Sequence, residues 1–131
     1  MSLDTENPSF QKGLEMRRKL MGEAATKRLE AGEVDDFYIP LENFVTKAVF
    51  GDSWNSTDLQ LRERLMVTLG IVSALGKELP TRRLTRLCVT NGITKEEIRG
   101  VLTQTIAYAG VGAGVEAWEW ASETLKELGE Y

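Results

Sequence analysis

The chain of 131 residues contains no histidine. Imidazole is the usual general base near neutral pH and a common zinc ligand, so its absence excludes a Ser-His-Asp triad and a histidine-based zinc site. Proton transfer must therefore use a carboxylate, a lysine, a tyrosine, a cysteine or the substrate itself.

Cysteine is nearly absent too, because Cys88 is the single thiol. A disulfide within the chain and a CxxC redox pair are both excluded. Cys88 lies at helical spacing from Leu84 and Leu87, which indicates a small buried side chain rather than a nucleophile.

An excess of positive charge and a long apolar run are also missing. The net charge is −4, which disfavours a nucleic-acid partner, because such a partner needs a clustered basic surface. The most apolar stretch, 65–75, is interrupted by polar or small residues and is shorter than the about 20 residues of a membrane span. No signal peptide is recognisable, so we expect a cytoplasmic protein without a membrane partner.

The sequence does contain helix signals along its whole length. Asn7-Pro8 predicts the start of a helix that reaches about Leu20. Further helices are expected over 24–31, from Pro40 to Gly51, from Thr57 to Gly76, from Pro80 to Asn91, from Thr94 to about Tyr108, and over 113–128. The prediction is an all-α fold of five to seven helices in one domain, 1–131, with residues 1–7 disordered or left over from expression.

Two helix starts have the spacing of a capping box, in which each side chain satisfies a free N–H of the other residue. Thr94 precedes Glu97 by three positions, and Thr57 precedes Gln60 in the same way. A loop with Trp54 is expected between Gly51 and Ser56. The glycine-rich segment 110–114 predicts a tight corner before the last helix.

The predicted helices have more apolar surface than one small core needs. Trp118 and Trp120 are two residues apart, so they point about 200° apart on a helix. We therefore expect a homo-oligomer with a helical, apolar interface. The alternative is a monomer with a few exposed apolar side chains.

The order and spacing of three blocks resemble the carboxymuconolactone decarboxylase family from about Gly13 onward. The blocks are Gly13–Arg18; Gly51-Asp52-x-Trp54 with Leu59 and Arg62-x-Arg64; and Asn91–Ile98 with Val101-Leu102, Gln104-Thr105, Tyr108 and Gly110-Val111. The first block looks like the decarboxylase branch rather than the redox branch, whose CxxC pair is missing.

The resemblance implies an all-α homo-oligomer, a trimer or hexamer, with a role in aromatic catabolism. It also implies removal of CO2 from 4-carboxymuconolactone. Leu84 and Glu119 stand where family members commonly have histidine, and Gly112 stands where they commonly have proline.

The candidate site residues follow from what such a decarboxylation requires. Glu119 is the candidate acid–base residue, because it stands where the resemblance implies a histidine, and Tyr108 is the second catalytic candidate as a hydrogen-bond donor. An arginine suits the substrate carboxylate because guanidinium binds it bidentately. The substrate-binding candidates are Arg62, Arg64, Arg82, Arg83, Trp54, Gly110 and Gly112. For each single residue the plainer interpretation is a solvated or packing side chain.

Two hypotheses remain open. The first is a decarboxylase of a small carboxylated lactone or keto-acid that uses no metal and no organic cofactor. The second is a non-catalytic helical oligomer. A buried Glu119 facing a cavity lined by arginine favours the first, and a solvated Glu119 without such a cavity favours the second.

Overall fold

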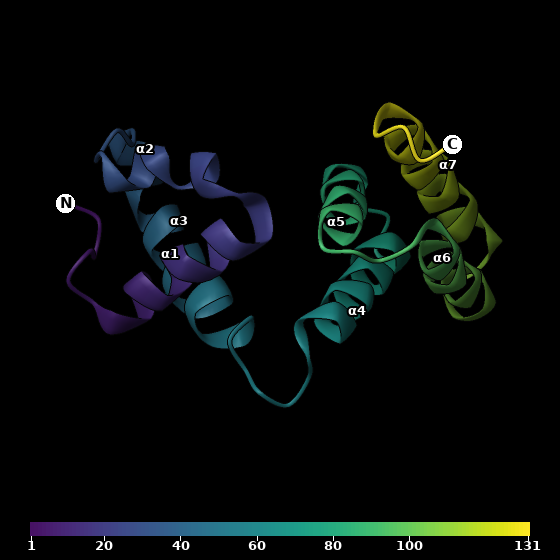
Figure 1. Cartoon of the computed structure of the whole chain (residues 1–131), viewed down its shortest axis with the longest axis horizontal. Helices are drawn as coiled ribbons and strands as arrows, with labels where there is room; N and C mark the ends of the chain where they lie inside the picture. The colour runs from purple at the N-terminus through teal and green to yellow at the C-terminus, as the bar shows by residue number, and fades with distance from the viewer. The chain divides into compact units, whose positions relative to one another are not determined.

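A computed structural model describes residues 1–131 and consists of seven α-helices, shorter helical turns and no strand (Figure 1). The all-α prediction is confirmed. By their internal contacts the residues form two compact units, Met1–Leu59 and Gln60–Tyr131, and each is described by itself. One domain over the whole chain stays a prediction. None of the helices combines the length and the apolar character needed to cross a bilayer.

The N-terminal unit, Met1–Leu59, is built around a contact between α1 and a π-helical segment. It contains α1 (Pro8–Met21), α2 (Lys27–Glu30), α3 (Ile39–Phe44) and the π-helix η3 (Val45–Ser53) that continues α3, with single 3₁₀ turns at Glu23–Ala25 and Asp36–Tyr38. The predicted start of α1 is confirmed, because the Asn7 side chain accepts hydrogen bonds from the backbone of Ser9 at 2.8 Å and Phe10 at 3.2 Å.

Close backbone contact explains two glycines of this unit. A Cβ at Gly13 would lie 1.8 Å from the carbonyl oxygen of Thr46, and one at Gly51 would lie 2.2 Å from that of Ser9. The helical segment extends through Gly51 to Ser53. The prediction that a loop begins at Gly51 is therefore wrong. Residues 1–7 are in contact with the same unit, since the Asp4 backbone donates to Asn43 Oδ1 at 2.8 Å.

The C-terminal unit, Gln60–Tyr131, contains four longer helices: α4 (Leu61–Ala74), α5 (Glu78–Thr90), α6 (Lys95–Ala109) and α7 (Val111–Glu127). The predicted start of α4 at Thr57 is wrong, because Gln60 is itself the N-cap and forms a capping box with Glu63. The predicted start of α6 is confirmed: Thr94 and Glu97 exchange hydrogen bonds of 3.0 and 3.1 Å.

The core of this unit takes residues from all four helices, and α7 contacts each of the others. Its apolar members are Leu65, Leu69, Cys88, Ile93, Ile98, Leu102, Ala117, Ala121 and Leu125. Within the apolar stretch 65–75, Leu65 and Leu69 are buried, whereas Leu75, which follows α4, is 65% exposed.

The predicted corner between α6 and α7 is confirmed. Gly110 ends α6 with φ +100°, which disfavours any side chain. A Cβ at Gly114 would lie 2.1 Å from Ile106 Cγ1 and 3.0 Å from Ile106 Cα. The absence of side chains here lets α7 fold back along α6, and this arrangement positions the pocket described next.

Candidate functional site: a cationic pocket between α6 and α7

The arginines predicted to bind substrate do not line a cavity. Arg62 forms an ion pair with Glu97. Arg82 donates to Glu123 at 2.6 Å and to Glu78 at 3.1 Å. The hydrogen bond to the Glu123 carboxylate is the main cause that raises the pKa of the Arg82 guanidinium. These side chains therefore stabilise the helix packing.

The other two predicted arginines also lie outside the cavities. Arg64 is half-buried on α4, and Arg83 is exposed on α5. Neither lines the pocket between α6 and α7 or the groove between α4 and α6.

The remaining predicted site residues are not brought together either. Glu119 is exposed on α7 and lines no cavity. Tyr108 is 86% exposed at the edge of a shallow apolar groove between α4 and α6. Gly110 and Gly112 are exposed at the start of α7. Trp54 lies in the N-terminal unit, stacked on Phe50 with ring centroids 6.3 Å apart.

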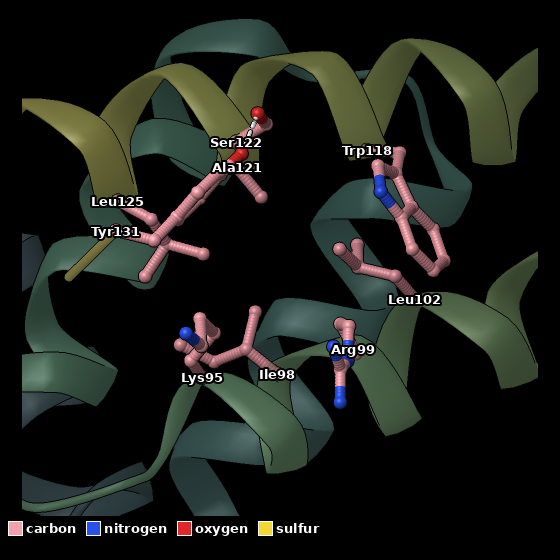
Figure 2. A pocket seen from close by; sticks show the side chains of 9 residues that line it. All are labelled: Lys95, Ile98, Arg99, Leu102, Trp118, Ala121, Ser122, Leu125 and Tyr131. Carbon is pink, nitrogen blue, oxygen red and sulfur yellow. Dashed lines mark hydrogen bonds between the residues drawn. The ribbon is translucent and has the colours of Figure 1, made fainter.

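A cavity of about 340 Å³ lies between α6 and α7 (Figure 2). Its lining residues are Lys95, Ile98, Arg99, Leu102, Trp118, Ala121, Ser122, Leu125 and Tyr131. The criterion that separates the two hypotheses is met only in part. An arginine lines this cavity, which favours the decarboxylase, but Glu119 is solvated, which favours the non-catalytic oligomer.

The α6 wall supplies two cations, Lys95 and Arg99, which are one turn apart and so share a helix face. The Arg99 side chain makes no hydrogen bond or ion pair within the chain, so its donors are available to a ligand. Lys95 is only weakly engaged: its ammonium lies 3.5 Å from the Glu130 carbonyl oxygen and 5.6 Å from the Tyr131 ring centroid.

The α7 side supplies an aromatic ring and two hydroxyls. Trp118 covers one end, and at the other end the Tyr131 hydroxyl is hydrogen-bonded to Ser122 (Figure 2). The Tyr131 ring also lies 5.3 Å from the Lys126 ammonium, so two cations hold it in place. No acidic side chain lines the cavity.

The floor of the cavity is apolar and belongs to the core. Ile98, Leu102 and Ala121 are at most 2% exposed. A floor of this kind excludes water from one side of a bound ligand, which strengthens its attraction to the half-buried Lys95 more than to the exposed Arg99. The arrangement suits a small acid with an apolar body.

Lys95 and Arg99 are the functional candidates that sequence reasoning missed. The signal available was a lysine and an arginine one turn apart on α6, with Ile98 and Leu102 inward on the same side. In sequence alone this pattern equals an ordinary amphipathic helix whose basic residues are solvated. The pocket differs from an ordinary amphipathic helix because Trp118 of α7 faces α6. No local sequence pattern predicts this contact.

Comparison with known proteins gives consistent matches. The sequence profile described as the Carboxymuconolactone decarboxylase family matches residues 40–123. The chain is 32% identical over 120 residues to the 4-carboxymuconolactone decarboxylase of Acinetobacter baylyi, which covers 92% of this chain and 89% of the relative. It is 25% identical to the nitrosuccinic acid decarboxylase of Metarhizium robertsii, over 100% of this chain and 96% of that protein. The chain belongs to the carboxymuconolactone decarboxylase family.

Proposed function

We propose that the protein decarboxylates a small carboxylated lactone or keto-acid without a metal or organic cofactor, as part of aromatic catabolism in the cytoplasm. The observation that carries the proposal is the match, along nearly the whole chain, to two proteins named as decarboxylases of organic acids. The pocket between α6 and α7 is the proposed acid-binding site, because it combines an unpaired guanidinium with an apolar floor.

The chemistry needs little from the protein. The bond between carbon and the departing carboxylate breaks, CO2 leaves, and the electron pair is delocalised into the conjugated carbonyl of the substrate. A proton then goes to carbon. Arg99 binds a second carboxylate of the substrate, one that is not lost as CO2. The Lys95 ammonium gives the proton to the substrate carbon and then takes a proton from water.

Glu119 as proton donor and Tyr108 as hydrogen-bond donor keep their proposed roles only in an assembly that encloses them, because both are exposed in the single chain. The same condition applies to Arg62, Arg64, Arg82, Arg83, Trp54, Gly110 and Gly112 as substrate contacts. We also propose self-association as a trimer or hexamer, which the exposed apolar side chains on α4 and α6 support.

The test is CO2 release from a panel of carboxylated lactones and keto-acids, with wild type and Arg99→Ala compared. We expect at least one panel member to be turned over, and kcat/KM to fall at least about tenfold in Arg99→Ala, because a hydrogen bond to a charged group is lost. Arg28→Ala is the matched control, since Arg28 is exposed on α2 and outside the pocket. We expect only weak turnover of 4-carboxymuconolactone, because the chain has no histidine.

A panel without any CO2 release would refute the proposal and favour the second candidate, a non-catalytic helical oligomer. The observation in favour of that candidate is the solvated Glu119.

A further inference from the structure

The two cations of the α6–α7 pocket lie on the same wall. Lys95 and Arg99 both come from α6, and their spacing of one turn places the two Cβ atoms about 5–6 Å apart. In Figure 2 both residues lie on the lower helix, on either side of Ile98. A ligand with two anionic groups can therefore place one group on each cation only if both groups point toward α6.

The opposite wall offers no cation for a second anion to pair with. From α7 the pocket receives Trp118, Ser122 and the apolar Ala121 and Leu125, and none of them is charged. The Tyr131 and Ser122 hydroxyls bind each other. A carboxylate directed at this wall would lose its water and gain no cation, which is unfavourable.

The cavity volume limits the ligand to a small molecule. About 340 Å³ is at the lower end of the range for ligand pockets. The flat indole of Trp118 on one side and the apolar floor formed by Ile98 and Leu102 suit a planar, unsaturated carbon skeleton.

We propose that the pocket recognises cis-dicarboxylates: small planar acids whose two carboxylates lie on the same side of the molecule, one on Arg99 and one on Lys95. The inference takes from the proposed function the assignment of this pocket as the acid-binding site, and it adds the geometry of the acid. Arg99 is the stronger anchor because its fork binds a carboxylate bidentately, whereas Lys95 acts as a point charge.

The test uses three unreactive four-carbon acids: maleate (cis-dicarboxylate), fumarate (trans-dicarboxylate) and crotonate (monocarboxylate), titrated into the full chain by calorimetry at pH 8. We expect maleate to bind at least about tenfold more tightly than either of the others, since it alone engages both cations. In Lys95→Met the affinity for maleate should fall to that for crotonate. Lys77→Met is the matched control, because Lys77 is exposed at the start of α5 and lines no pocket.

Equal affinities for maleate and fumarate would overturn the inference, as would undetectable binding of maleate or a maleate preference that survives Lys95→Met. The comparison of the three acids on wild type needs no variant to fold. A protein that prefers maleate but releases no CO2 from any acid keeps this inference and loses the proposed decarboxylation. An active decarboxylase without the preference does the reverse.

Discussion

At the scale of single residues, Cys88 is a thiol made inert by its surroundings. It is fully buried among the helices of the C-terminal unit, and this burial raises the pKa of the thiol from 9.0 to about 12. Between these values the unfolded chain loses a proton that the folded chain keeps. The free energy of unfolding therefore falls as pH rises above 9, by about 1.4 kcal/mol per pH unit.

The measurement is urea unfolding of wild type and Cys88→Ala at pH 8 and at pH 10. We expect wild type to lose about 1 kcal/mol more than the variant over this interval, because only wild type has the thiol. Lysines and tyrosines also titrate between these pH values. Both chains contain them, so their contribution drops out of the difference between wild type and variant. Parallel pH profiles of the two chains would show that the Cys88 thiol is not held neutral by the fold.

The residue scale is also where sequence predicts least about the site. The family resemblance makes Glu119 a candidate by its position in the chain, but helical periodicity does not determine which side of α7 meets α6, and the residue faces solvent. Arg62 and Arg82 have the right chemistry, yet carboxylates from other helices already occupy them. Both outcomes depend on contacts between residues that are far apart in sequence.

At the scale of helices, the tight corner between α6 and α7 makes a sharp prediction about two glycines of α7. Gly114→Ala should destabilise the protein by about 1–3 kcal/mol, because the new Cβ would meet Ile106 at 2.1 Å. Gly112→Ala should be neutral or stabilising by up to about 1 kcal/mol, since a Cβ there has no atom within 4 Å and helix favours alanine.

Chemical denaturation of both variants at one pH checks this pair. Each change adds one methyl group to the same helix, so opposite effects isolate the contact with Ile106. Equal effects would mean that α6 moves away from α7 without cost.

Helix positions were largely predictable, for reasons that the capping residues make clear. Asn7 and Thr94 act within three residues of themselves, so local sequence is sufficient to place the starts of α1 and α6. The predicted helix start at Thr57 is wrong because Gln60, three residues later, forms a capping box with Glu63 instead. The π-helix at Val45–Ser53 was not predictable, because its partner is the Gly13 surface of α1, far away in the chain.

At the scale of the whole molecule, surface composition predicts self-association. Large apolar side chains remain exposed on α4 and α6 of the single chain, among them Val67 (49%), Ile71 (54%) and Tyr108 (86%). Val67 and Tyr108 line one apolar groove between α4 and α6, and large exposed apolar patches are rare on monomers. We expect light scattering at micromolar concentration to give the mass of a trimer or hexamer.

The variant that tests the surface is Ile71→Glu, which should lower the mass because it places a charge in the apolar face. Arg28→Glu changes an exposed residue of α2 and should leave the mass unchanged. A monomeric mass for wild type would contradict the proposed assembly.

The nine residues around the cationic pocket all fall between Lys95 and Tyr131, in one uninterrupted stretch of chain. All residues that line the proposed acid site therefore come from α6, α7 and the end of the chain, whereas α4 and α5 supply the opposite side of the core. Substitutions at the pocket-facing positions of this stretch are therefore expected to change the proposed acid preference without altering the sequence of α4 or α5.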